Sequence, residues 1–133
     1  MALTVEALDH LVVNVRDVEV TAAWYERVLG MVREEFGSAT LRRTAMKFGR
    51  QKINLRPITA SKDAWFTADY EASGSDDLCF LTGATPQAVA DPLRACGVPI
   101  IAGPTDKKGA MGTIVSVYCR DPDGSLIEIS SYK

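Results

Sequence analysis

The 133-residue sequence is short of the residues on which common metal and redox sites depend. It has a single histidine, His10, and three cysteines, Cys79, Cys96 and Cys119, which lie far apart. No CxxC pair is present to hold zinc or to run a redox cycle. We therefore expect the cysteines to be reduced and mostly buried, as is typical of a cytoplasmic protein.

Long apolar runs and an excess of basic charge are also missing. No run approaches the ~20 apolar residues that a membrane span needs, and the start MALTVEALDHL lacks the basic region of a signal peptide. Lys and Arg number 15 and Asp and Glu number 17, so the net charge is −2, with no basic stripe among aromatic residues. The sequence therefore predicts one folded cytoplasmic domain that binds neither nucleic acid nor a membrane.

The chain contains an internal repeat. LDHLVVNV (8–15) has a counterpart in SDDLCFLT (75–82), which aligns His10 with Asp77 at an offset of 67 residues (77 − 10 = 67). Apolar and polar residues alternate in both copies, as is typical of strands. The repeat therefore predicts two related halves, each beginning with a strand.

A helix with recognisable ends follows each of these strands. The first is expected to begin after Asp17 as its N-cap and to end at Gly30. The second is expected to begin after Thr85 and to end at Gly97, which lies 67 residues after Gly30 (97 − 30 = 67). Pro92 lies inside the second helix and cannot donate a backbone hydrogen bond, so we expect a kink or break near it. The apolar stripe of the first helix is expected to contain Val20, Trp24 and Val28.

Further strands complete each half. In the first half they are ATLRRTAMKFG and QKINLRPI, and in the second they are GTIVSVYCR and SLIEISSY, which a DPDG turn joins. Each half is thus β-α-β-β, with room for one more short strand. We place module 1 at about 5–58, a polar linker at 59–74 and module 2 at 75–133.

Alternation along the strands gives each one an apolar face and a face that carries polar groups. His10, Asn54, Asp77 and Glu128 lie on the polar faces. An acid such as Glu128 between two isoleucines is useful only where its face is wet or liganded. For His10 an incidental hydrogen-bonded residue is the alternative interpretation, and for Asp77 it is solvation at a strand edge.

Four segments resemble the vicinal oxygen chelate superfamily, which includes glyoxalase I, bleomycin-resistance proteins, fosfomycin-resistance enzymes and extradiol dioxygenases. They are LDHLVVNV, WYERVLGM, KFGRQKINL and GAMGTIVSVYCRDPDGSLIEISSY, and the last is the most specific. More narrowly, the chain is similar to small glyoxalase domain-containing proteins. The resemblance implies an α+β fold in which two βαβββ modules form one open, cupped mixed sheet over residues 1–133. It also implies a homodimer.

The resemblance also implies a divalent metal in the cup, held by His10, Asp77 and Glu128 and more weakly by Asn54. This oxygen-rich set suits Mn²⁺, Mg²⁺, Ni²⁺, Co²⁺ or Zn²⁺. Glyoxalase I, fosfomycin-resistance enzymes and extradiol dioxygenases have a second histidine where this chain has Asp77. With one histidine per site, a dioxygenase with the usual two-histidine set is close to excluded, and a thiol transferase is disfavoured.

The implied function is a glyoxalase-like lyase or isomerase that acts on a small substrate with vicinal oxygens. The metal would act as a Lewis acid, with Glu128 as the catalytic base. Arg56, Tyr118 and Tyr132 are candidate substrate-binding residues, although a solvated arginine and packing aromatics are the alternative interpretations. Two other functions stay open: a metal-free binding protein of the bleomycin-resistance type, and a dioxygenase or thiol transferase with an unusual ligand set.

Overall fold

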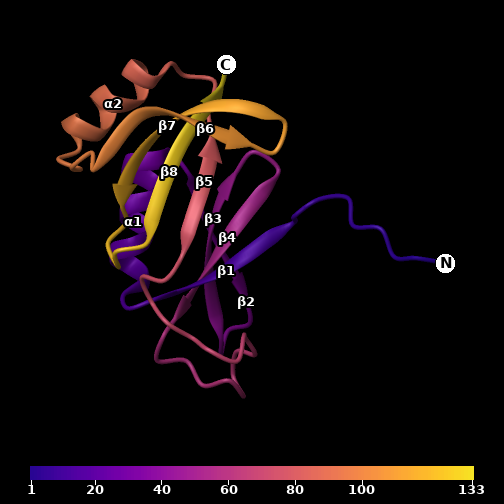
Figure 1. Ribbon diagram of the computed structural model, residues 1–133. Coiled ribbons are helices and arrows are strands. Elements are labelled where there is room, and N and C mark those ends of the chain that lie inside the picture. The colour runs from indigo at the N-terminus through magenta and orange to yellow at the C-terminus, as the bar shows by residue number, and fades with distance from the viewer. The chain divides into compact units, whose positions relative to one another are not determined.

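The computed structural model describes residues 1–133, which form two compact units, 1–71 and 72–133, each with one helix and one four-stranded sheet (Figure 1). The first unit contains β1 (His10–Val15), α1 (Val18–Leu29), β2 (Val32–Gly37), β3 (Arg42–Phe48) and β4 (Gln51–Pro57). The second contains β5 (Asp77–Leu81), α2 (Pro86–Ala95), β6 (Ala102–Gly109), β7 (Gly112–Arg120) and β8 (Leu126–Tyr132). The βαβββ prediction is confirmed for each half. Neither helix is long and apolar enough to cross a membrane.

The two sheets share one topology. Their strand orders are β1-β4-β3-β2 and β5-β8-β7-β6. In each sheet the first and last strands of the unit pair in parallel, and the remaining pairs are antiparallel. His10 is the first residue of β1 and Asp77 is the first residue of β5, so the repeat seen in the sequence is a structural repeat.

One face of each sheet is apolar and lies under the helix of its own unit. In the first unit Val13, Ile53 and Leu55 are at most 2% exposed, and α1 contacts β2, β3 and β4. In the second unit Val117 and Ile127 are equally buried, and α2 contacts β7 and β8. Each such side chain contributes about 1.5–3 kcal/mol when it is removed from water. This burial fixes which face of each strand points away from the helix.

The helix ends agree with the prediction. Asp17 accepts a hydrogen bond from the Val20 backbone N–H (3.2 Å), and Thr85 caps α2 in the same way through the N–H of Ala88 (3.2 Å). Gly30 has a φ of 66°, a left-handed conformation that favours glycine and ends α1. Two details of the prediction were wrong, and each has a physical reason.

The first concerns α2, for which a kink or a break near Pro92 was expected: a break is wrong, because the helix continues through Pro92 to Ala95, and a kink stays a prediction. Proline deprives the carbonyl of Ala88 of its partner, but both residues are exposed, so water can bind that carbonyl. The second is the apolar stripe of α1, because Val20 is 54% exposed. The buried residues of α1 are Thr21, Ala22, Trp24 and Tyr25, so the stripe is rotated away from Val20.

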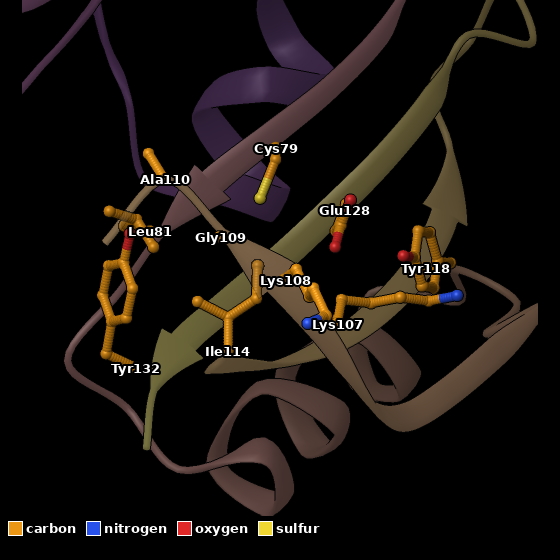
Figure 2. A pocket seen from close by; sticks show the side chains of 10 residues that line it. All are labelled: Cys79, Leu81, Lys107, Lys108, Gly109, Ala110, Ile114, Tyr118, Glu128 and Tyr132. Atoms are coloured by element: carbon orange, nitrogen blue, oxygen red, sulfur yellow. The ribbon is translucent and has the colours of Figure 1, made fainter. Parts of the chain in front are cut away.

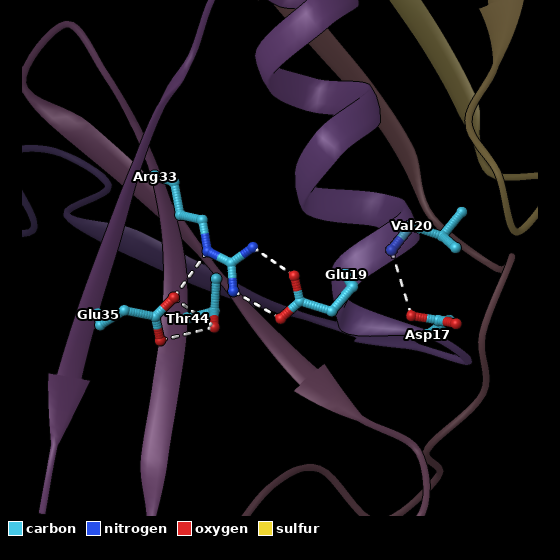
Figure 3. A network of polar contacts seen from close by, with 6 residues as sticks. All are labelled: Asp17, Glu19, Val20, Arg33, Glu35 and Thr44. Carbon is cyan, nitrogen blue, oxygen red and sulfur yellow. Dashed lines mark hydrogen bonds and ion pairs between the residues drawn. The ribbon is translucent and has the colours of Figure 1, made fainter.

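An arginine fork fastens α1 to the edge of its sheet (Figure 3). Arg33 donates to both carboxylate oxygens of Glu19 on α1 (2.6 and 2.7 Å) and to Glu35 on its own strand (2.7 Å). Thr44 on β3 also donates to Glu35 (3.0 Å). The guanidinium lowers the pKa of both carboxyls, so the network is held by ionised partners.

A buried arginine holds the segment that follows β4. Arg56 is fully buried and donates to the side chains of Asn14 (2.8 Å) and Glu71 (2.5 Å). It also donates to the carbonyl oxygens of Ala60 (2.7 Å) and Trp65 (3.2 Å). Most of the segment expected to be a linker therefore belongs to the first unit, as far as Glu71.

None of the three cysteines forms a disulfide, but the expectation that they are mostly buried was wrong. Only Cys119 is buried, whereas Cys79 is exposed and Cys96 is half-buried. Cys79 lies on β5, which is an edge strand of its sheet, and this position explains its exposure. Burial, with a smaller contribution from the charge of Asp121, raises the pKa of Cys119 to about 11.

This raised pKa predicts an alkaline loss of stability. The ordinary thiol pKa is 9.0, so between pH 9.0 and about 11 the unfolded chain releases a proton that the folded chain keeps. The free energy of unfolding should therefore fall more steeply over this range in the wild type than in Cys119→Ala, as measured by thermal unfolding. Below about pH 8 the two proteins should have equal slopes. If the free energy of unfolding depends on pH equally in both proteins from about pH 8 to about 11, the prediction is wrong.

Candidate functional site

Two of the candidate ligands lie on the first sheet, on the face away from α1. His10 pairs with Lys52 across β1 and β4, and Asn54 follows two residues later on β4. Side chains two residues apart on a strand point to the same side. The imidazole of His10 and the amide of Asn54 therefore share one face of the sheet.

The imidazole of His10 is held by its neighbour. Its Nδ1 lies 2.8 Å from Oδ2 of Asp9, and the side chain is 44% exposed. An ionised carboxylate only accepts hydrogen bonds, so this contact places a proton on Nδ1, and Nε2 is the ring nitrogen that remains to bind an ion. Metal-binding histidines are commonly oriented by a carboxylate in this way.

The amide oxygen of Asn54 is a buried acceptor without a donor. Asn54 is 6% exposed, and its Oδ1 is the one buried side-chain oxygen or nitrogen that has no hydrogen-bond partner. Leaving such an atom unsatisfied costs about 1–3 kcal/mol. A donor or a cation at this position would remove that cost.

The other two candidate ligands lie on the corresponding face of the second sheet. Val12 is opposite Asn54 in the first sheet, and Cys79 is opposite Glu128 in the second. Glu128 thus occupies the position in β8 that Asn54 occupies in β4. Asp77 is exposed at the start of β5.

Glu128 is held by a chain of hydrogen bonds on the sheet surface. Ser116 Oγ donates to Glu128 Oε2 (2.5 Å) and lies 2.7 Å from Ser130 Oγ, which lies 3.4 Å from Cys79 Sγ. A carboxylate only accepts, and a hydroxyl has one hydrogen. The chain therefore runs in one direction, from Cys79 through Ser130 and Ser116 to Glu128. The buried hydroxyl of Ser116, itself held by the buried hydroxyl of Ser130, thus fixes one oxygen of the carboxylate.

A cavity of about 450 Å³ opens on this face of the second unit (Figure 2). Glu128, Tyr118 and Tyr132 line it, as expected for a site, but Asp77 does not. Burial raises the pKa of Tyr118, and the nearby Glu128 raises it further, so the phenol stays a neutral donor beside the carboxylate. Tyr132 accepts a hydrogen bond from the Met111 backbone N–H (3.0 Å).

Sequence reasoning missed several residues that line this cavity. They are Cys79, Leu81, Lys107, Lys108 and Ile114. The two lysines come from β6, a stretch that carries no periodic apolar pattern. The consecutive lysines before the glycine-rich hairpin were the available signal.

Arg56 is buried, and its guanidinium donates hydrogen bonds to other groups of the protein. Its guanidinium contacts Asn14, Glu71 and two backbone carbonyls, so it is not the solvated arginine that we considered as an alternative. Three of these contacts hold the segment 60–71, and the fourth joins the guanidinium to Asn14 on β1.

Within either unit, no three His, Cys, Asp or Glu side chains are close enough to one another to hold a metal ion. Each unit supplies two of the candidate ligands, which are His10 and Asn54 in the first and Asp77 and Glu128 in the second. That these two pairs share one ion stays a prediction.

The chain belongs to the Glyoxalase/Bleomycin resistance protein/Dioxygenase superfamily, whose model matches residues 7–129. The resemblance seen in the sequence is thereby confirmed, and so is the fold class that it implied, with its two α+β modules.

Two relatives cover nearly the whole chain. Virulence protein STM3117 of Salmonella typhimurium is 40% identical over 132 residues, which is 98% of this chain and 87% of that protein. Glyoxalase domain-containing protein RDO1 of Mycosarcoma maydis is 40% identical over 131 residues, 98% of this chain and 71% of that protein.

Solved structures agree with the fold. An integron cassette protein from the mobile metagenome of V. cholerae has a TM-score of 0.93 and 41% identity over 100% of both chains. A lactoylglutathione lyase from Agrobacterium tumefaciens (22% identity over 96% of this chain and 95% of that one) has a TM-score of 0.70. The antibiotic binding protein TnmS3 from Streptomyces (18% identity over 99% and 100%) has a TM-score of 0.75. At these identities the last two share the fold alone.

The serine chain gives a prediction about stability. Ser116→Ala removes the acceptor of Ser130 and the donor of Glu128, so it should lower the free energy of unfolding by about 1–2 kcal/mol in urea denaturation. Ser131→Ala, on the opposite face of the same sheet, is the matched control and should change it by less than about 0.5 kcal/mol. If both variants lose the same free energy of unfolding, the hydrogen bonds of Ser116 make no specific contribution to stability.

Proposed function

We propose that the protein is a divalent-metal-dependent lyase or isomerase of the glyoxalase type, acting on a small substrate with vicinal oxygens. In this proposal His10, Asn54, Asp77 and Glu128 hold the ion. The observation that carries it is the buried Oδ1 of Asn54, which has no partner and shares a sheet face with His10. An amide oxygen and an imidazole nitrogen are both suitable donors for Mn²⁺, Ni²⁺, Co²⁺ or Zn²⁺, and the oxygen also suits Mg²⁺.

Local contacts support the assignment of two of the four donors, His10 and Glu128. Asp9 orients the imidazole through Nδ1, so that Nε2 is the nitrogen that would bind the ion. The hydrogen bond from Ser116 holds Oε2 of Glu128, which limits the carboxylate to a narrow range of orientations. An oriented donor loses less conformational entropy on binding an ion or substrate than a free side chain does.

The chemistry follows from these residues. A bound divalent ion would supply Lewis acidity at the oxygens of the substrate. Glu128 would accept a proton from the substrate carbon and return it, as a general base and then a general acid. Tyr118, a neutral phenol beside Glu128, would donate a hydrogen bond to a substrate oxygen.

A second candidate function is metal-free sequestration of a small molecule, as in antibiotic-binding relatives of this fold. The observation that favours it is the cavity wall formed by Ile114, Tyr118 and Tyr132, which suits a flat apolar ligand. This candidate predicts tight binding of such a ligand after the protein has been treated with a chelator.

Metal binding tests the first proposal. Purified protein should bind Mn²⁺ stoichiometrically, as measured from the loss of the free Mn²⁺ signal in electron paramagnetic resonance. His10→Ala should abolish tight binding, and Asp9→Asn should weaken it by about 10–100-fold because the imidazole loses its orienting carboxylate. Asp91→Asn, an exposed carboxylate on α2, is the control and should bind as the wild type does.

Asn54→Leu separates binding from folding. It removes an unsatisfied acceptor, so it should keep or raise the free energy of unfolding while it lowers the affinity for Mn²⁺. If the wild type binds none of Mn²⁺, Mg²⁺, Ni²⁺, Co²⁺ or Zn²⁺, the metal-dependent function is wrong and sequestration takes its place. Undiminished binding in His10→Ala would overturn the ligand assignment alone.

A further inference from the structure

The cavity of the second unit has an excess of positive charge. Lys107 and Lys108 from β6 and Glu128 from β8 are its only charged lining residues, which gives a net charge of +1 (2 − 1 = 1). The whole chain has a net charge of −2. The cavity therefore differs in sign from the protein around it.

Neither lysine is neutralised by an acid of the chain. The acid beside them on β6 is Asp106, whose Oδ2 binds Nζ of Lys133 at 2.9 Å. Glu128 accepts from Ser116 and forms no ion pair with either lysine. The two ammonium groups are thus available to an anion from outside.

Lys107 lies within the cavity rather than extending away from it. It is opposite Ile114 in the pairing of β6 and β7, and its Nζ lies 5.9 Å from the centre of the Tyr118 ring. Figure 2 shows the side chain extended across the cavity toward Tyr118. A cation over an aromatic face is weakly attracted to it, which keeps the ammonium beside Tyr118.

The rest of the wall is apolar. Leu81, Ile114 and the ring of Tyr132 line the end of the cavity away from Tyr118 (Figure 2). A volume of about 450 Å³ is in the range of small-molecule sites. The cavity thus offers positive charge to one part of a ligand and apolar contact to another.

We propose that this cavity binds a small organic anion, a carboxylate or a phosphate ester, whose charged group is held by Lys107 and Lys108. Its carbon skeleton lies against Ile114 and Tyr132. That this anion is the substrate rests on the proposed function, since Glu128 lines the same cavity. The binding of the anion itself needs no metal. The competing explanation is that lysines on an edge strand hinder pairing with other chains.

The experiment uses full-length protein with a chelator and three probes that share a phenyl ring: benzoate, phenyl phosphate and neutral benzamide. Dissociation constants come from the ¹H–¹⁵N shifts of the amides of β6, β7 and β8. Both anions should bind about tenfold more tightly than benzamide, the worth of one charge-assisted hydrogen bond. The preference should shrink as salt is added, because the lysines are near the surface.

Two double variants with equal net charge separate local from overall electrostatics. Lys107→Met/Lys108→Met should bind all three probes with similar affinity, because methionine keeps much of the stem and removes the charge. Lys47→Met/Lys62→Met, whose lysines lie outside the cavity, should keep the tenfold preference. Equal binding of anions and benzamide by the wild type would overturn the proposal, as would a preference that survives in Lys107→Met/Lys108→Met. Aggregation of that variant, seen by light scattering alongside equal binding by the wild type, would assign the lysines to protection of the edge strand.

The same samples distinguish this inference from the proposed function. Mn²⁺ should bind to Lys107→Met/Lys108→Met as it does to the wild type, since neither lysine is a ligand. If the wild type prefers anions but binds no metal, the anion site is supported and the metal-dependent function is wrong. If the wild type binds Mn²⁺ but does not prefer anions, the anion site is wrong and the metal-dependent function is unaffected.

Discussion

The parallel pairing of the first and last strands of each unit is the contact on which the candidate site depends. It brings β1 beside β4 and β5 beside β8, although more than thirty residues separate the partners along the chain in each case, about as many as a crossover unit requires. Through this pairing His10 comes to lie beside the strand that carries Asn54, and Cys79 comes to lie opposite Glu128. The helix in between covers the apolar face, so the polar face is the one left for chemistry.

The polar side chains on the sheet face away from the helix form different hydrogen bonds in the two units. Asn54 and Arg56 on β4 correspond to Glu128 and Ser130 on β8, each at an offset of 74 (128 − 54 = 74; 130 − 56 = 74). In the second unit the serine belongs to a chain that satisfies the carboxylate. In the first unit the arginine instead holds the following segment, and the amide is left without a donor. The units have thus kept one register and diverged in what the polar residues stabilise.

Much of the fold could be predicted because it follows from local rules. Three features could be recognised in the sequence, and the structure agrees with them. They are the repeat offset, the helix caps at Asp17 and Thr85, and the alternation in β1 and β8. The exposure of Val20 and the continuity of α2 through Pro92 could not be read in this way. They depend on where each helix lies over its sheet and on access of water to one carbonyl.

The candidate site was predictable only in part, for a related reason. Alternation identified Asn54 and Glu128, because a polar residue between apolar neighbours stands out in one strand. The serine chain and the lysines depend on which strands are neighbours across the sheet, and a single sequence does not give that register. Arg56 was a candidate for binding the substrate, but three of its four hydrogen-bond partners lie in a segment whose path has no sequence pattern.

The solitary histidine also has a spectroscopic consequence. Because His10 is the one imidazole of the chain, its ring signals in a nuclear magnetic resonance spectrum require no assignment. Nδ1 faces the carboxylate of Asp9 and Nε2 does not, so the two ring nitrogens have different surroundings and their ¹⁵N shifts distinguish the tautomers. The natural protein thus carries an intrinsic probe of tautomer state and metal coordination at the residue where the candidate site begins.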